Sequence, residues 1–288
     1  MTLEPQSVWP VAAELGEGPI WIDDVLWFVD IKKQQLHRFE PVSGSKQSWT
    51  APEQVGFVVP RARGGLIVGL QSGLWSFEPA TGSFAPIVAV DAHHNNNRLN
   101  DAVVDAQGRL WFGTMHDGET DKTGAFYLYA DGQLLETGLS GICITNGPAI
   151  SPDGRTIYWV DTLGGTIFAA EVQEGGRLGH SRLLATIPSA AGYPDGPTVD
   201  AQGCIWIGLY AGWAARRYSP EGELLGTIEF PIANITKIAF GGAAGTTMFA
   251  TTARQMLTAE QLRGQPQAGD LFAMPGTVRG LSCYAVRD

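Results

Sequence analysis

The sequence predicts an all-β fold, a six-bladed β-propeller with four-stranded antiparallel blades around a central channel. Short apolar segments rich in aromatic residues recur along the 288 residues at intervals of 40 to 48 positions. A repeat of about 40 to 50 residues built from short strands and turns is typical of propeller blades, and radial closure protects the edges of their sheets. The segments, which we expect to be the second strands of the blades, begin at Leu26, Leu66, Leu110, Ile157, Ile205 and Met248.

Further strands and turns are expected after these segments. Residues 35–39 and 73–77 follow the first two and run into the similar turns Glu-Pro-Val-Ser-Gly and Glu-Pro-Ala-Thr-Gly. The 37 glycines and 17 prolines of the chain supply residues for many such turns. Only residues 258–263 are expected to form a short helical turn. To close the ring, residues 7–13 are expected to pair with residues 281–286.

The composition of the chain bears on the number of domains, the class of binding partner, membrane association and cellular location. No linker, low-complexity tract or charge block divides the chain, so residues 1–288 are expected to form one propeller domain. The formal net charge of −10 and the lack of a Lys/Arg-rich stretch argue against a nucleic-acid partner. No apolar run approaches the roughly 20 residues that a membrane helix needs, and the first residues lack the features of a signal peptide. Three widely spaced cysteines fit reduced thiols in a cytoplasmic protein. We expect a monomer that acts on a small molecule.

One position of the repeat carries residues suited to chemistry. When the repeats are superposed, Glu17, Asn100, Asn146 and Asp195 occupy equivalent places near the start of the innermost strand. Because inner strands line the channel, these side chains would converge on the axis. Their oxygens would be undersatisfied without a cation. Such ligands suit Ca²⁺, Mg²⁺ or Mn²⁺, and Zn²⁺ and Fe²⁺ also accept carboxylates. The alternative is that Asx-Gly-Pro is turn chemistry repeated at a blade edge. The glutamate favours the cation site, since glutamate has no strong turn preference.

Five motifs lie along nearly the whole chain, at residues 15–21, 97–101, 111–115, 145–154 and 193–196. Together they resemble the regucalcin/gluconolactonase family, and within it the bacterial sugar-acid lactonases such as the xylonolactonases. The resemblance implies a six-bladed propeller with one divalent metal held by residues matching Glu17, Asn146 and Asp195. It also implies substrate-binding residues matching Arg98 and Asn100.

The roles expected for Glu119 and Arg98 each have an alternative interpretation. Some family members bind sugar hydroxyls through a glutamate on the loop that corresponds to residues 116–123, and this loop departs from their pattern. Glu119 is the candidate for that contact, and a solvated loop acid is the alternative. Arg98 could instead form a structural ion pair at the mouth of the channel.

The expected function is divalent-metal-dependent hydrolysis of a pentono- or hexonolactone, such as D-xylonolactone or D-gluconolactone, to the aldonic acid. The metal would polarise the lactone carbonyl, and Asp195 would be both a ligand and the general base for the attacking water. No Gly-x-Ser-x-Gly element indicates covalent catalysis. A sulfonated or phosphorylated lactone is disfavoured because Arg98 is the one basic residue securely placed in the pocket. A propeller phosphotriesterase and a non-catalytic metal-binding or interaction module are the alternative functions.

Overall fold

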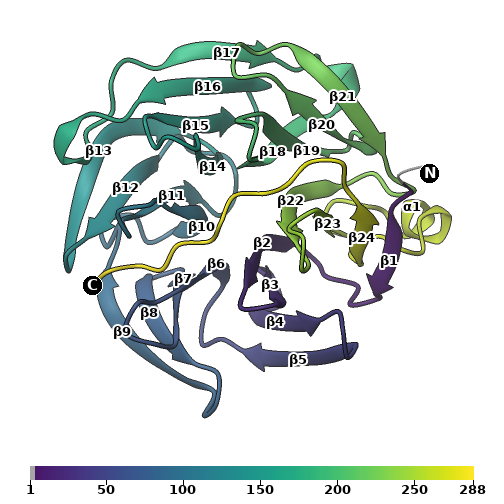
Figure 1. The fold of residues 1–288 in the computed structure, drawn as a ribbon, viewed down its shortest axis with the longest axis horizontal. Coiled ribbons are helices and arrows are strands. Elements are labelled where there is room, and N and C mark those ends of the chain that lie inside the picture. The colour runs from purple at the N-terminus through teal and green to yellow at the C-terminus, as the bar shows by residue number, and fades with distance from the viewer. Residues whose placement is uncertain (1–3) are drawn as a thin grey trace.

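Six four-stranded antiparallel sheets are arranged radially around a central axis in the computed structural model, which describes residues 4–288 (Figure 1). The predicted all-β, six-bladed propeller is therefore confirmed. In blades 1 to 5, four strands consecutive in the sequence pair in chain order, and the first of them lies innermost. Blade 6 combines three strands from the end of the chain with one from its beginning.

The strands of the blades are short and of similar length. Blades 1 and 2 contain β2 (Gly16–Ile22), β3 (Val25–Asp30), β4 (Gln35–Glu40), β5 (Ser45–Thr50), β6 (Val55–Pro60), β7 (Leu66–Leu70), β8 (Gly73–Glu78) and β9 (Ser83–Ala89). Blades 3 and 4 contain β10 (Asn97–Val104), β11 (Leu110–His116), β12 (Gly124–Ala130), β13 (Gln133–Ile142), β14 (Thr145–Ile150), β15 (Thr156–Asp161), β16 (Thr166–Glu171) and β17 (Arg182–Thr186). Blades 5 and 6 contain β18 (Tyr193–Val199), β19 (Ile205–Tyr210), β20 (Ala214–Tyr218), β21 (Leu224–Glu229), β22 (Ile235–Gly241), β23 (Thr247–Thr252), β24 (Leu271–Pro275) and β1 (Gln6–Trp9).

The recurring apolar segments are the second strands, as predicted, and each strand begins within one residue of the expected position. These strands are buried along nearly their whole length because each blade packs face to face against its two neighbours. Aromatic rings join the blades. Trp21 of blade 1 stacks on Phe249 of blade 6 with ring centroids 5.6 Å apart, and Trp27 meets Phe77 of blade 2 edge to face. The hydrophobic core therefore lies between the blades, around the channel.

A buried aspartate anchors the turn between the first and second strands in blades 3 and 5. Asp200, fully buried, accepts hydrogen bonds from two backbone N–H groups of its own turn, from the indole of Trp206 and from Arg217. Asp105 makes the same set of contacts in blade 3, with Trp111 as the indole donor. The repeated Asp-Ala-Gln-Gly sequence thus encodes a four-donor carboxylate site that ties each turn to its blade.

The ring closes differently from the sequence-based prediction. Strand β1 pairs with β24, and Ser7 donates a hydrogen bond to Asp270 beside this pairing. The expected partner, residues 281–286, does not pair with the N-terminal strand, so that part of the prediction is wrong. Strands β22 to β24 already supply three strands of blade 6, and β1 fills its free edge. The predicted short helix is present as α1 (Ala259–Gly264), which begins after a capping box formed by Thr258 and Gln261.

The last ten residues, 279–288, form a C-terminal strap that crosses one end of the channel (Figure 1, yellow). Its first part bridges to Asp200 of blade 5 and its last part to Arg61 of blade 2. Asp288 ends the strap in an ion pair with Arg61. The strap therefore joins blades on opposite sides of the ring and lies across one end of the channel. In the part of the chain that the structure describes, no helix is long and apolar enough to span a bilayer.

Asp200→Ala is expected to lower the free energy of unfolding by about 2 to 4 kcal/mol, because it leaves buried donors unpaired. Urea denaturation followed by tryptophan fluorescence measures the change. Asp153→Ala, in the exposed turn of blade 4, is the matched control and is expected to cost under about 1 kcal/mol. Equal losses in the two variants would contradict the anchoring role of Asp200.

Candidate functional site

Every inner strand is irregular at the level where the candidate residues lie. The register between the first and second strands shifts in all six blades, for example between Glu17 and Ile20 and between Asn146 and Ala149. A bulge of this kind bends the strand and re-aims its side chains. Gly147 lies inside one bulge with a φ of 86°, and a Cβ there would be 2.7 Å from Pro197 of the next blade. Glycine is therefore required after the asparagine, and the bulge turns the asparagine toward the axis.

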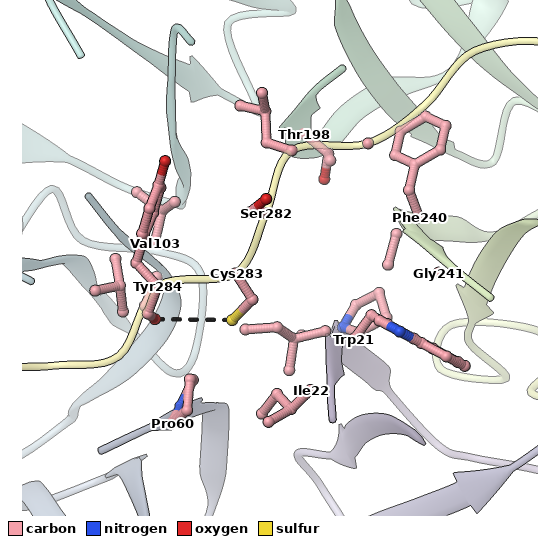
Figure 2. A pocket seen from close by; sticks show the side chains of 18 of the residues that line it. Trp21, Ile22, Pro60, Val103, Thr198, Phe240, Gly241, Ser282, Cys283 and Tyr284 are labelled. Carbon is pink, nitrogen blue, oxygen red and sulfur yellow. Dashed lines mark hydrogen bonds between the residues drawn. The ribbon is translucent and has the colours of Figure 1, made fainter. Parts of the chain in front are cut away.

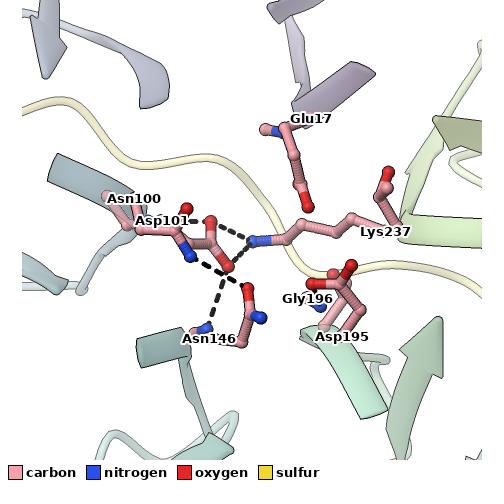
Figure 3. Close-up of polar contacts among 12 residues, drawn as sticks. Glu17, Asn100, Asp101, Asn146, Asp195, Gly196 and Lys237 are labelled. Atoms are coloured by element: carbon pink, nitrogen blue, oxygen red, sulfur yellow. Dashed lines mark hydrogen bonds and ion pairs between the residues drawn. The ribbon is translucent and has the colours of Figure 1, made fainter. Parts of the chain in front are cut away.

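The three predicted metal ligands meet near the axis, each on the inner strand of a different blade. Glu17 lies on β2, Asn146 on β14 and Asp195 on β18, and all three side chains are at least 94% buried (Figure 3). They line a cavity of about 350 Å³ that opens at the end of the channel opposite the strap. All the candidates named from the sequence line this same cavity; the others are Arg98, Asn100 and Glu119.

The two carboxylates have few partners in the protein. Glu17 accepts a hydrogen bond from the N–H of Gly18, and Asp195 accepts one from the N–H of Gly196, at 3.0 and 2.9 Å. In residues 4–288, no other protein donor forms a hydrogen bond with either carboxylate. Each acid therefore presents one oxygen to the cavity that the protein does not satisfy, which is unusual for a buried carboxylate.

Burial disfavours the charged form of both acids. It raises the pKa of Glu17 to about 7, and the nearby carboxylate of Asp101 adds to the rise. Burial also raises the pKa of Asp195 well above its ordinary value, and the charge of Glu17 acts in the same direction. A divalent cation between them would reverse this effect, since it favours both charged forms.

The donor set fits a hard cation. It consists of two carboxylates and the amide oxygen of Asn146, whose Nδ2 donates to Thr162 at 2.8 Å and so fixes which end of the amide faces the centre. Among the described residues, no group of three or more His, Cys, Asp or Glu side chains could hold a metal ion. The oxygen-only set therefore depends on the asparagine as its third member, and oxygen ligands suit Ca²⁺, Mg²⁺ or Mn²⁺.

Asn100 does not contribute an oxygen to the centre, contrary to the convergence of four oxygens expected from the repeat. Its Oδ1 accepts a hydrogen bond from Nη1 of Arg98 at 2.6 Å. Its Nδ2 donates to Oδ1 of Asn146 at 3.1 Å and to the carbonyl of Thr145 at 2.7 Å. Asn100 thus connects the arginine to the candidate ligand and fixes the position of both.

Arg98 is almost fully buried and pairs with Asp117, its Nε lying 2.8 Å from Oδ1 of the carboxylate. The structural ion pair considered from the sequence is therefore present, although Arg98 also lines the cavity. Nη2 of Arg98 has no hydrogen bond to the described residues and can donate into the cavity. Asp117 also accepts hydrogen bonds from Lys32 and Gln54. Although partial burial opposes ionisation, these bonds and the arginine lower the pKa of Asp117 to about 2.

Three charged residues around the site were not among the candidates named from the sequence. Asp117 lies two residues before Glu119 on the same loop, so either acid fits the loop position. Asp101 directly follows Asn100 and belongs to the motif at residues 97–101. Lys237 is a lone charge in the apolar strand β22, which is the one sequence signal that could have singled it out. Glu119 itself lies half-buried at the cavity.

Lys237 and Asp101 form a buried ion pair across the channel, with Nζ 2.5 and 2.7 Å from the two carboxylate oxygens (Figure 3). On the other side of this pair, a second cavity of about 660 Å³ lies under the strap. Figure 2 shows Cys283 and Tyr284 of the strap over this cavity, with Trp21 and Phe240 on its walls. Lys237 and Asp101 line the second cavity and not the first, so the pair is the floor between them.

Comparison with known proteins identifies the family of the chain. Residues 15–254 match the model of the SMP-30/Gluconolactonase/LRE-like region. The chain is 34% identical over 273 residues to 6-deoxy-6-sulfogluconolactonase of Pseudomonas putida, covering 92% of each chain. It is 30% identical to regucalcin of Xenopus laevis, covering 93% of each. The crystal structure of the calcium-binding protein regucalcin from Agrobacterium tumefaciens superposes with a TM-score of 0.95 at 26% identity, covering 99% of this chain and 98% of the other. On the extent of these matches, the chain belongs to the SMP-30/gluconolactonase/LRE-like family.

Proposed function

We propose that this chain hydrolyses a sugar-acid lactone to the aldonic acid, with one divalent cation held by Glu17, Asn146 and Asp195. The observation that carries the proposal is the pair of buried, underpaired carboxylates at the base of a cavity that also presents Arg98. The names of the relatives support it, since one is a sulfogluconolactonase and another is described as calcium-binding. D-xylonolactone and D-gluconolactone are the substrates we propose to try first.

Hydrolysis of a lactone needs a proton acceptor for water, stabilisation of charge on the carbonyl oxygen and a proton for the ring oxygen. A divalent cation, when bound, supplies Lewis acidity at the carbonyl. Asp195 has one oxygen free of protein partners, so it can accept the proton of the attacking water and return it to the ring oxygen as the C–O bond breaks. Nη2 of Arg98 can donate to a substrate oxygen, while Asn100 and Asp117 hold the guanidinium in place. Glu119 is placed to accept a hydrogen bond from a substrate hydroxyl.

The charges of the cavity favour an uncharged lactone. Glu17, Glu119 and Asp195 line the cavity together with a single cation, Arg98, which is already paired with Asp117. Away from the proposed cation, a sulfonate would find one basic lining side chain, Arg98, whose charge Asp117 already balances. We therefore propose a neutral sugar lactone in place of the sulfonated substrate that the name of the Pseudomonas relative indicates.

We also propose that the protein is a cytoplasmic monomer. Cys143 and Cys204 are buried and unpaired, and Cys283 is a free thiol at the strap. Free thiols persist in a reducing compartment. Size-exclusion chromatography with light scattering checks the oligomeric state.

Removal of divalent cations with a chelator is expected to abolish lactonase activity, and adding back Ca²⁺, Mg²⁺, Mn²⁺, Zn²⁺ or Fe²⁺ separately is expected to restore it with one or more of them. Asp195→Asn is expected to lower kcat by at least about 100-fold, because it removes the proton acceptor and one ligand charge. Acid release above the spontaneous rate with cation and buffer alone is the measurement.

The matched control for this series is Asp153→Asn, which changes an exposed turn far from the channel and should leave the rate unchanged. Turnover of a phosphotriester but of no lactone would favour the phosphotriesterase alternative. A cation-binding protein without either activity would favour the non-catalytic module.

Cation affinity is expected to rise as the pH rises through about 7. Below this pH Glu17 is largely protonated in the cation-free protein, and the raised pKa of Asp195 favours its neutral form as well. A bound cation must then displace protons, and affinity falls by up to about tenfold per pH unit for each proton displaced. Isothermal titration calorimetry between pH 5.5 and 8.5 in two buffers of different ionisation enthalpy measures both the affinity and the protons released. Affinity that is independent of pH, with no proton release, would count against Glu17 as a ligand.

Arg98→Met is expected to lower kcat/KM by about 10- to 100-fold, since it removes a charged donor to the substrate. Steady-state kinetics with whichever of the two lactones the native protein hydrolyses measures the loss. Arg61→Met, whose arginine pairs with Asp288 at the strap, is the matched control. Cation affinity should be unchanged in Arg61→Met, and full activity of Arg98→Met would show that the arginine has a structural role only.

A further inference from the structure

The Lys237–Asp101 pair lies beneath the candidate cation site and has no role in the chemistry described so far. Lys237 enters from β22 of blade 6, and Asp101 comes from β10 of blade 3. The inner strands contact one another in the ring order β2, β6, β10, β14, β18, β22. Blades 3 and 6 are therefore diametrically opposite, and the two side chains together span the channel (Figure 3).

Both members of the pair touch the backbone next to a candidate ligand. Asp101 accepts a hydrogen bond from the N–H of Gly147, the residue after Asn146, at 3.1 Å. The aliphatic part of Lys237 packs on Gly196, the residue after Asp195, so closely that a Cβ there would be 2.8 Å from it. The pair therefore supports two of the three ligands from below.

The pair also adds two opposite charges in a region from which water is largely excluded. Both side chains are at most 8% exposed, so each charge acts on its neighbours through a low dielectric. Asp101 disfavours and Lys237 favours a negative charge on Glu17. Because the two charges are in direct contact, their effects on a cation above them nearly cancel.

We propose that Lys237 and Asp101 are positioning residues that close the channel beneath the cation and hold the floor of the site electrically neutral, so that the negative charge that attracts the cation comes from Glu17 and Asp195. The proposal rests on the cation site of the proposed function. Without Lys237 the floor would be anionic and would attract a second cation through the opposite cavity. Without Asp101 the lysine would repel the cation.

A charge role and a merely structural role give different results in a double-variant cycle. Asp101→Asn keeps an acceptor for Gly147 and leaves the lysine uncompensated, so we expect roughly tenfold weaker cation binding. Lys237→Met keeps the length of the stem over Gly196 and leaves the aspartate uncompensated, so we expect roughly tenfold tighter binding. The double variant, neutral like the native pair, should bind within about threefold of the native protein.

Isothermal titration calorimetry at pH 8 with the cation that the native chain binds measures all four affinities, and thermal unfolding confirms that each variant is folded. Arg61→Met, which removes a positive charge at the strap, is the control for net charge and should leave affinity unchanged. If Lys237→Met does not fold, Asp101→Asn and the double variant still distinguish the two roles. Only a charge role predicts that the double variant binds the cation more tightly than Asp101→Asn does.

Three outcomes overturn the proposal. Weaker binding in the double variant than in Asp101→Asn would show a structural role only. Native affinity in both single variants would show that the floor has no influence on the cation. A native chain that binds no divalent cation would remove the cation site of the proposed function and this inference with it, whereas native binding with unresponsive variants would remove the inference alone.

Discussion

The mutual repulsion of buried carboxylates at the axis is the constraint on which the rest of the site depends. Glu17 and Asp195 lie in the same small cavity, each held by a single backbone N–H and each with an oxygen left free. Without a cation, burial and proximity keep their pKa values high. Burial of these two acids with few partners lowers the free energy of unfolding of the cation-free protein, and a bound cation would raise it again. It supports the cation site proposed above independently of any catalytic role.

The propeller meets this constraint by varying one position on a repeated scaffold. All six inner strands bulge at the same level, and the bulge points one side chain of each strand toward the axis. The strands supply different groups there: a carboxylate from blades 1 and 5, an amide from blades 3 and 4, and the hydroxyl of Thr236 from blade 6, with Lys237 one residue further along. Blade 2 supplies Gly56, where a Cβ would lie 2.4 Å from the carbonyl of Leu99. Six equivalent strands thus give an asymmetric site, open at one end and closed by an ion pair at the other.

The two ends of the channel differ in the residues that line and cover them. The cavity with the candidate ligands opens away from the strap, and Leu163, Tyr193 and Met256 are exposed at its mouth. The other end is covered by the strap and walled by aromatic side chains. Because Lys237 and Asp101 fill the space between, a substrate reaches the axis from one face only. The strap in turn fastens blades 2 and 5 across the ring, so the closed end also braces the fold.

The amino-acid sequence was sufficient to predict the architecture and to name most residues of the candidate site. The spacing of the apolar segments predicted six blades because each blade needs one second strand that is buried on both faces. Glu17, Asn146 and Asp195 could be found because a repeat brings equivalent positions together, so that equivalence in sequence becomes proximity on the axis. Asn100 was found in the same way, Arg98 and Glu119 followed from the family resemblance, and all six line one cavity.

Only the tertiary structure decided how these groups are paired. No repeat indicates that the oxygen of Asn100 faces Arg98 and not the centre, since an amide chooses its orientation from all its neighbours. The pair Arg98–Asp117 joins a strand to a loop, and the pair Lys237–Asp101 joins two opposite blades. The members of the second pair are 136 positions apart in the sequence. The edge of blade 6 was likewise filled by residues 6–9 and not by pairing with residues 281–286. The local sequence pattern specifies which strands form and which side chains they carry. Several distant residues of similar chemistry could pair with a given charged group, and only closure of the ring sets the distances between them.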